Sequence, residues 1–365
     1  MTKRAIVCVS NDLSTDQRVH KTCLTLQKCE YEVVEMGRIL HNSIPIERPY
    51  STIRKKLIFN SGPQFYAELN IRFLFHLLFA KVDLIFSNDL DTLLACYLAS
   101  KIRRKRLIYD THELYTEVPE LYHRQFKKYL WEQLEKFILP SIQHAITVCN
   151  LIATYYESKY KISMAVVRNI PNLPETKFEK IDLKTENKNI ILYQGALNEG
   201  RCLENILQAM TMIPDGHLII IGDGDLTSKL IKISKDLNVT DKVEFIGKID
   251  GTQLHHYTQM AKVGLCLLEN VGLNYYYALP NRIFDYLHAG VPVLASDFPE
   301  ISSIVTQFKT GVLIKNNDPE NIAVSINQLL KNGFDTSHFP SICAKLNWEN
   351  EEKVLINVIR KSEQK

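Results

Sequence analysis

The sequence predicts an α/β protein with two Rossmann-like, doubly wound domains, each built on a parallel sheet, that face each other across a cleft. Three observations support this fold class. The 365 residues suit two domains at roughly 150 residues each. Short apolar runs alternate with longer helical patterns, and the alternation is interrupted once. The runs are almost continuously apolar, as in parallel sheets that helices cover on both faces.

The interruption, residues 171–188, is rich in proline and charge and weak in periodicity. We interpret it as a linker between an N-terminal domain, 1–170, and a C-terminal domain, 189–345. Residues 346–365 are predicted to form a last helix, which could pack back on the N-terminal domain. Ligands of such sheets bind where strands end, so the loops that follow strands should carry the site. The predicted strands are 5–10, 32–36, 84–87, 106–109, 145–148 and 165–167, then 189–193, 217–221, 243–246, 263–268, 291–295 and 310–314.

Charge and cysteine content restrict the class of protein. The net charge of +3 is too small for a nucleic-acid binder. Residues 1–170 hold 24 Lys and Arg against 17 Asp and Glu, and the rest is mildly acidic. The basic residues gather at 54–56, 101–106 and 124–128, either as solvated surface or as a patch resting on anionic lipid. The eight cysteines form no C-x-x-C pair, which favours a reducing compartment.

The hydrophobic runs indicate a location. The first apolar run is only five residues long and reads as a strand rather than a signal peptide. The longest apolar stretch is far shorter than the roughly 20 residues that span a bilayer. We therefore expect a cytoplasmic protein, either free or peripheral on the inner membrane face.

Residues 279–296 (LPNRIFDYLHAGVPVLAS) form the most informative motif. Pro280 suits the first turn of a helix and Gly290 suits its end. Arg282 and Asp285 are three residues apart and share one helix face. A guanidinium near a helix N-terminus favours phosphate, and a carboxylate one turn on could accept hydrogen bonds from ribose hydroxyls. The alternative is an ordinary surface ion pair.

This motif resembles the donor-binding helix of GT-B glycosyltransferases, in particular the retaining family 4. Further blocks resemble the same family: 193–204 (YQGALNEGRCLE), 219–225 (IIIGDGD) and 242–248 (KVEFIGK). Three N-terminal blocks, 11–21, 87–92 and 109–115, resemble a bacterial subgroup that assembles surface polysaccharides. The resemblance implies a GT-B fold and a retaining hexosyl- or glycosyltransferase. Its N-terminal domain would bind the acceptor, and its C-terminal domain would bind a nucleotide sugar.

The resemblance also implies a set of donor-binding residues. Arg201 begins the next predicted helix and would be a second cation on the diphosphate, unless it is simply solvated. Gly195 and Gly222 end strands where backbone can approach a ligand, although Gly222 could also belong to a plain turn. The positions implied for donor binding are Gly195, Arg201, Gly222, Lys248, Asn274, Pro280, Asn281, Arg282 and Asp285.

In the N-terminal half, the resemblance places His112 near the reaction centre of the sugar, with Glu113 as a less certain catalytic partner. The alternative for His112 is a helix cap. Asp16 and Arg18 follow the first strand, where the family has an acceptor-facing loop, although Arg18 could equally be a surface cation. Asp89 is a further acceptor-side residue, or a cap for the helix predicted to begin at Thr92.

One departure from the family pattern bears on activity. The family commonly has two glutamates separated by seven residues, and here those positions hold Tyr277 and Asp285. Glu269, Asn270 and Asn274 are polar candidates for the missing contact with the donor sugar. Two other functions therefore stay open: an inactive GT-B protein that binds sugar nucleotides or acts as a scaffold, and a GT-B nucleotide-sugar epimerase.

The expected reaction needs neither a cofactor nor a metal ion, because the sequence has no metal-binding Asp-x-Asp of the GT-A type and no zinc spacing. The expected partners are a UDP- or GDP-linked sugar, a glycan or lipid-linked acceptor, and the inner leaflet of the membrane.

Overall fold

The computed structural model describes residues 2–14, 16–41, 43, 45–122, 124–172, 189–249 and 251–364. The chain divides into two compact units. One contains Met1–Asn169 together with Glu351–Lys365, and the other contains Ile170–Asn350. We call them the N-terminal and the C-terminal unit. Of the predicted linker, residues 173–188 lie outside the described residues.

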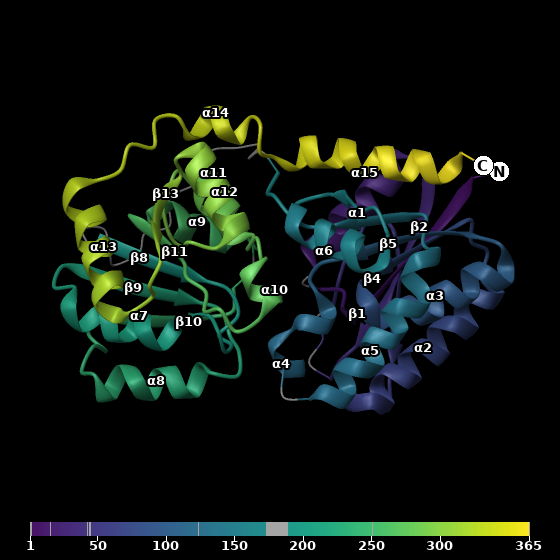
Figure 1. Cartoon of the computed structure of the whole chain (residues 1–365), viewed down its shortest axis with the longest axis horizontal. Coiled ribbons are helices and arrows are strands. Elements are labelled where there is room, and N and C mark those ends of the chain that lie inside the picture. The colour runs from purple at the N-terminus through teal and green to yellow at the C-terminus, as the bar shows by residue number, and fades with distance from the viewer. Residues whose placement is uncertain are drawn as a thin grey trace. The chain divides into compact units, whose positions relative to one another are not determined.

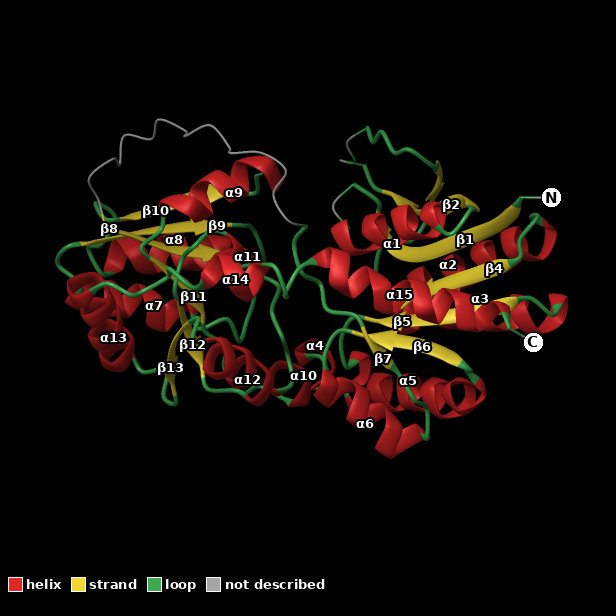
Figure 2. Cartoon of the chain, turned by 90° about the horizontal axis from the view of Figure 1, so that it is seen from above, coloured by secondary structure: helices red, strands yellow, loops and turns green. Residues whose placement is uncertain are grey.

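The N-terminal unit is a parallel α/β sandwich (Figures 1 and 2). Its strands are β1 (Lys3–Asp12), β2 (Tyr31–Ile39), β3 (Ser51–Lys56), β4 (Leu84–Asn88), β5 (Arg106–Thr111), β6 (His144–Thr147) and β7 (Ala165–Val166). Its helices are α1 (Gln17–Lys28), α2 (Gly62–Phe79), α3 (Asp89–Arg103), α4 (Pro119–Tyr122), α5 (Gln125–Ile138) and α6 (Asn150–Tyr160). Short 3-10 helices lie at Tyr115–Glu117 (η1) and Leu139–Ser141 (η2).

The sheet of this unit has the order β3-β2-β1-β4-β5-β6-β7, and every pair is parallel. The winding reverses between β1 and β4, and the site of a doubly wound fold is expected at that point. On one face, Ile6, Val34 and Ile85 pack against α2 and α3 through side chains such as Phe73 and Cys96. Helix α1 packs on β1 and β2.

Strand β3 was not predicted from the sequence. Its residues, STIRKK, are half-exposed or exposed, and β3 is the edge strand beside β2. An edge strand with polar side chains lacks the apolar run by which the other strands were recognised. The basic residues at 54–56 are therefore part of a sheet edge.

The C-terminal unit has a second parallel sheet, of order β10-β9-β8-β11-β12-β13. Its strands are β8 (Asn189–Gln194), β9 (Gly216–Ile221), β10 (Val243–Gly247), β11 (Val263–Cys266), β12 (Val293–Ser296) and β13 (Gly311–Ile314). Its helices are α7 (Leu203–Ala209), η3 (Met210–Met212), α8 (Thr227–Asp236), α9 (Gly251–Met260), α10 (Leu273–Tyr276), α11 (Arg282–His288), α12 (Pro299–Phe308), α13 (Pro319–Asn332) and α14 (Phe339–Cys343).

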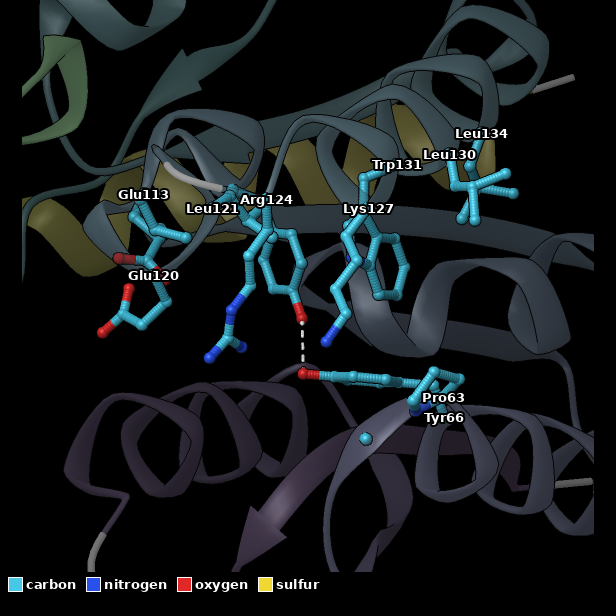
Figure 3. A pocket seen from close by; sticks show the side chains of 13 residues that line it. Pro63, Tyr66, Glu113, Glu120, Leu121, Arg124, Lys127, Leu130, Trp131 and Leu134 are labelled. Atoms are coloured by element: carbon cyan, nitrogen blue, oxygen red, sulfur yellow. Dashed lines mark hydrogen bonds between the residues drawn. The ribbon is translucent and has the colours of Figure 1, made fainter.

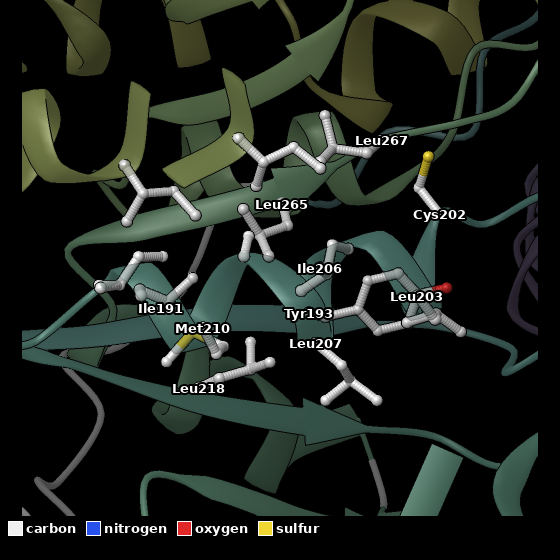
Figure 4. Packing of buried hydrophobic residues seen from close by; sticks show 14 of the residues in the cluster. Ile191, Tyr193, Cys202, Leu203, Ile206, Leu207, Met210, Leu218, Leu265 and Leu267 are labelled. Atoms are coloured by element: carbon white, nitrogen blue, oxygen red, sulfur yellow. The ribbon is translucent and has the colours of Figure 1, made fainter. Parts of the chain in front are cut away.

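The core of this unit is a continuous cluster of aliphatic side chains (Figure 4). Ile191 and Tyr193 from β8 and Leu218 from β9 pack against Leu203 and Ile206 of α7. These residues are almost completely buried, and each buried aliphatic side chain stabilises the fold by roughly 1.5–3 kcal/mol. The rigid core fixes the carboxyl ends of β8 and β9, where two glycines of the candidate site lie.

The last helix, α15 (Trp348–Glu363), belongs to the N-terminal unit from Glu351 onward. Glu352 accepts hydrogen bonds from Thr25 and Lys28 of α1, and Glu351 forms an ion pair with Arg168. Near the end of the helix, Glu363 pairs with Lys3. Among the described residues, no helix combines the length and apolar character that crossing a bilayer requires.

Candidate active-site residues in the two units

Arg282 is a buried cation in the C-terminal unit. Its side chain stacks on the ring of Tyr193, with 4.8 Å from the guanidinium carbon to the ring centroid, and Nη1 donates to the carbonyl of Gln194 at 3.2 Å. Nε and Nη2 are buried and have no hydrogen-bond partner among the described residues. The thiol of Cys266 also lies beside the guanidinium, but a thiol is a weak acceptor. Buried N–H groups without acceptors are costly, so this position is suited to an anionic ligand.

Asp285 and Arg282 are both hydrogen-bonded to Gln194. The side-chain amide of Gln194 donates to Asp285 Oδ2 at 2.9 Å, while its backbone carbonyl accepts from Arg282. Thr258 donates to the amide oxygen of Gln194 at 2.9 Å, which fixes the orientation of the amide. We call Gln194, Gly195, Gly222, Arg282 and Asp285 the Arg282 cluster. Sequence reasoning missed Gln194, although its place at the end of β8 was a signal.

The two glycines of the Arg282 cluster are required by close packing. A Cβ on Gly222 would lie 1.9 Å from the carbonyl oxygen of Gly195. A Cβ on Gly195 would lie 3.1 Å from Nη1 of Arg282. Both residues have a positive φ, 136° for Gly195 and 141° for Gly222, which other residues rarely adopt. Only glycines therefore allow the ends of β8 and β9 to meet beside the guanidinium.

The start of helix α11 differs from the prediction. The helix begins at Arg282 with Asn281 as its N-cap, so Pro280 precedes the first turn instead of lying in it. The carbonyl of Pro280 accepts from the N–H of Ile283 at 3.1 Å, which makes the proline part of the turn that leads in. The predicted helix end is confirmed, since Gly290 follows the C-cap with φ 76°.

Arg201 lies before helix α7, which begins at Leu203, and so does not begin the helix as predicted. Its guanidinium carbon is 4.8 Å from the ring centroid of Tyr275, and Nε is buried without a hydrogen-bond partner among the described residues. A Cβ on Gly200 would lie 2.4 Å from the Tyr275 ring, so the two loops are packed tightly. Tyr275, which sequence reasoning did not select, thus orients this second cation.

The remaining candidates for donor binding are Asn274, Asn281 and Lys248. Asn274 is buried in the short helix α10, whereas Asn281 and Lys248 are exposed. Lys248 directly follows β10, in the loop that the family resemblance associates with the nucleobase. The role of these three residues in donor binding stays a prediction.

In the N-terminal unit, Arg18 has a different setting from the one predicted. It lies in the first turn of α1 with 4% of its surface exposed. Nε and Nη2 donate to the two carboxylate oxygens of Asp110 at 3.0 and 2.8 Å, and Nη1 donates to the carbonyl of Val167 at 2.7 Å. Arg18 is therefore a buried cation that holds Asp110, so the alternative of a surface cation was wrong. Its acceptor-side role stays a prediction.

His112 lies between two carboxylates just after β5. Its Nδ1 is 3.2 Å from Oδ2 of Asp89, and its backbone N–H donates to Oδ1 of the same residue at 2.9 Å. Its Nε2 is 3.3 Å from Oδ2 of Asp110, and apart from this ionic contact Nε2 has no hydrogen-bond partner among the described residues. We call Arg18, Asp89, Asp110 and His112 the His112 cluster.

The charges of the His112 cluster follow from these contacts. Burial disfavours the imidazolium, but the carboxylates of Asp89 and Asp110 outweigh it and raise the pKa of His112 well above its usual value. Burial would raise the pKa of Asp110, yet Arg18 and His112 lower it to about 2. The two carboxylates therefore favour the protonated form of the imidazole, whose buried Nε2 lies next to Asp110.

Two further acids, Asp16 and Asp91, lie at the same end of this sheet as Asp89. Asp16 is the N-cap of α1 and accepts from the N–H of Val19 at 3.0 Å, so its placement is explained by helix capping. Asp89 is the first residue of α3, which begins three residues earlier than predicted, with φ 56°. Asp91 was considered only as a cap, yet it is buried, and burial together with Asp89 raises its pKa to about 7.

Two parallel-sheet units of this topology, each with polar clusters where strands end, define a protein of the GT-B fold. Residues 19–176 match the model for Glycosyltransferase Family 4, and residues 174–346 match the model for Glycosyl transferases group 1. Together these matches cover 19–346, and the chain belongs to the GT-B glycosyltransferases.

Individual relatives are distant. An uncharacterized glycosyltransferase of Methanocaldococcus jannaschii, MJ1607, is 25% identical over 48% of this chain and 45% of its own length. The chain thus spans about half the length of the curated relatives it matches. Among solved structures, sucrose-phosphate synthase from Thermosynechococcus elongatus has a TM-score of 0.79 at 19% identity, covering 98% of both chains. Anabaena Alr3699/HepE in complex with UDP-glucose has a TM-score of 0.76 at 13% identity, covering 98% of this chain and 99% of that one.

Proposed function

We propose that the protein is a retaining glycosyltransferase that moves a sugar from a nucleoside-diphosphate sugar to a glycan or lipid-linked acceptor, without a divalent metal ion. The observation that carries the proposal is the guanidinium of Arg282. It is buried beside two glycines and keeps two N–H groups without acceptors among the described residues. A diphosphate would supply those acceptors together with negative charge, which makes its hydrogen bonds to a guanidinium stronger than those of a neutral acceptor.

In this proposal Arg282 takes up the negative charge that builds on the departing diphosphate. A fixed cation in a site shielded from water stabilises such charge more than the same cation in bulk solvent. Arg201, held by Tyr275, is the second cation. Asp285, oriented by Gln194, accepts hydrogen bonds from the ribose hydroxyls. The complex of HepE with UDP-glucose supports a UDP-linked donor, and GDP is the other candidate.

His112 is proposed to donate its Nε2 proton in a hydrogen bond to the transferred sugar or to its leaving phosphate. Its raised pKa supports this role, because a charged donor forms the stronger hydrogen bond. Glu113 follows it in the chain and is the proposed second catalytic residue. Arg18 holds the Asp110 carboxylate next to His112 and is the proposed positioning residue.

The deciding experiment measures release of nucleoside diphosphate from UDP- and GDP-sugars with EDTA present. We expect Arg282→Met to lower kcat/KM by about 10²–10³-fold, and Arg282→Lys to restore part of it. Lys229→Met removes an exposed cation paired with Glu204 in the same unit and is the matched control. Thermal unfolding of each variant shows whether it is folded. Unchanged turnover in a folded Arg282→Met protein would refute the proposal, and NMR of the anomeric proton of the product tests retention.

Tyr277, in place of the first family glutamate, supports a second candidate, an inactive sugar-nucleotide-binding protein. The same assay separates the two functions. Binding of UDP or GDP that depends on Arg282, without turnover of any sugar nucleotide on any acceptor tried, would favour the inactive protein.

We also propose that helix α5 rests on the cytoplasmic surface of the membrane. Its exposed side chains combine aromatic rings and cations, the composition of helices that lie in a lipid interface. These side chains are Phe126, Tyr129, Phe137, Lys127 and Lys136. Sedimentation with vesicles tests this contact: binding should require anionic lipid and should fall in Phe126→Ser/Phe137→Ser. Equal binding of that variant would contradict the proposal.

A further inference from the structure

A pocket in the N-terminal unit lies beside the His112 cluster but is separate from it (Figure 3). It has a volume of about 560 Å³, in the range that holds small-molecule ligands. Its walls come from α2, η1, α4 and α5. Glu113, the residue after His112, lines one end. A molecule in this pocket would therefore extend to the end of β5.

The pocket has an aromatic wall. The ring of Trp131 meets Tyr66 edge-on at a centroid distance of 5.0 Å and Tyr115 at 5.1 Å. The hydroxyl of Tyr115 contacts that of Tyr66 at 3.5 Å, which links η1 to α2. These rings are only partly buried, so they offer an apolar surface that a ligand could cover.

Two cations project into the same space. Arg124 and Lys127 line the pocket, and Figure 3 shows both side chains directed toward the region of the Tyr66 hydroxyl. Neither forms an ion pair or a side-chain hydrogen bond in the part of the chain that the structure describes. Lys128, next to them, is by contrast paired with Glu117 at 2.8 Å. The pocket therefore has positive charge available for an anionic group.

The ends of the pocket differ in chemistry. In Figure 3 the carboxylates of Glu113 and Glu120 lie toward one end, and Leu130 and Leu134 lie toward the other. Carboxylates accept hydrogen bonds from hydroxyls. Leu130 is also 52% exposed on the surface of α5, so the apolar end continues onto the face proposed to rest on lipid.

We propose that this pocket binds the acceptor, and that the acceptor is an amphiphile in which an acidic phosphate group joins a hydroxyl-bearing end to an apolar chain. The phosphate lies between Arg124 and Lys127, the hydroxyl-bearing end points toward Glu113, and the chain leaves along Trp131 and Leu130. This inference rests on the proposed transferase function, because it names the acceptor class for that activity.

The test uses tryptophan fluorescence, since the chain has two tryptophans and Trp348 is buried in the C-terminal unit. In a Trp348→Phe background, Trp131 reports on the pocket. Decyl phosphate below its micelle concentration is the probe. We expect it to change the Trp131 emission, and Arg124→Gln/Lys127→Gln to weaken its binding by about tenfold or more. Lys128→Gln is the matched control and should bind as the parent does.

Two further probes identify the ligand chemistry. Decyl glucoside has the chain without the charge, and glucose 1-phosphate has the charge without the chain; each should bind at least about tenfold more weakly than decyl phosphate. Glucose 1-phosphate binding as tightly as decyl phosphate would point to a soluble phosphorylated acceptor and overturn the amphiphile. Decyl phosphate binding that is unaffected by Arg124→Gln/Lys127→Gln would overturn the site. UDP and GDP binding, measured separately on the parent protein, tests the proposed function independently.

Discussion

The carboxylate of Asp110 accepts hydrogen bonds from Nε and Nη2 of Arg18 inside the N-terminal unit. The Asp110 side chain is 0% exposed and the Arg18 side chain is 5% exposed. The partners are 92 positions apart in the sequence, and they bring the start of α1 to the end of β5. The same carboxylate lies 3.3 Å from His112 Nε2. One buried anion thus fixes the position of the proposed catalytic imidazole and compensates two cations.

Asp110→Asn should destabilise the protein by about 3–5 kcal/mol, because it leaves the Arg18 guanidinium buried without its counter-charge. Urea unfolding followed by circular dichroism measures the loss. Glu132→Gln removes a half-exposed partner of Lys159 and is the control, with an expected change below about 1 kcal/mol. Equal effects of the two substitutions would contradict the assigned role of the buried pair.

The His112 imidazole should be protonated at pH 7.5, because Asp89 and Asp110 raise its pKa. His76, whose pKa is lowered by burial and by Lys55, should be neutral at that pH. Long-range ¹⁵N–¹H NMR of the imidazole rings distinguishes the two states. A neutral His112 at pH 7.5 would remove the charged donor from the proposed mechanism.

The contributions of His112 and Asp110 to the free energy of unfolding should change with pH in opposite directions. The contribution of His112 is fully present below about pH 6.5, its unfolded value, and is lost as pH rises through its folded pKa. The contribution of Asp110 is present above about pH 4 and is lost as pH falls toward 2. Urea unfolding across pH measures both slopes. In His112→Gln the alkaline slope should disappear, and its persistence would assign it to another group.

Gly222→Ala should destabilise the C-terminal unit by several kcal/mol, on the order of the larger core effects, because its Cβ would overlap the Gly195 carbonyl. Gly290→Ala is the control. It also has a positive φ, but no atom lies within 4 Å of the added Cβ, so only about 1 kcal/mol of backbone cost is expected. Thermal unfolding measures both. A Gly222→Ala protein as stable as Gly290→Ala would show that the ends of β8 and β9 can separate freely.

Asp285 should contribute to nucleotide binding through the ribose hydroxyls. UDP should bind the parent about tenfold or more tightly than 2′,3′-dideoxy-UDP, because hydrogen bonds to a carboxylate are worth about 1.5–3 kcal/mol. In Asp285→Asn this ratio should shrink. In Gln194→Leu, which removes the hydrogen bond from the Gln194 amide to the carboxylate, the ratio should shrink in part. Titration calorimetry gives the affinities; a ratio unchanged in Asp285→Asn would place the ribose elsewhere.

The buried parallel strands could be predicted because each reads as an apolar run, and Gly290 could be predicted as a helix end from its place after the periodic segment. Strand β3 could not, since its residues are polar and lie at a sheet edge. The candidate site was predicted only in part. Arg282 and Asp285 stood out by their spacing on one helix, but Gln194, which joins them, comes from a strand 88 residues away from Arg282.

Burial of individual charges was the least predictable property. Arg18 resembles a surface cation in the sequence, and only the fold shows that α1 directs it at Asp110. The aromatic pocket also could not be predicted from the sequence, because Tyr66, Tyr115 and Trp131 come from three separate elements and are brought together only by tertiary packing. Local patterns report which residues face a core, whereas pairing across the fold depends on topology.

The polypeptide enters the C-terminal unit at Ile170 and leaves it again before Glu351, so the N-terminal unit is assembled from both extremities of the chain. A single proteolytic cut between the units would leave an N-terminal fragment without the partners of Lys3, Lys28 and Arg168. Loss of the final fifteen residues would therefore destabilise the N-terminal unit, although most of that unit lies at the other end of the sequence. For the same reason, the two units could not be exchanged between relatives as two consecutive segments of sequence.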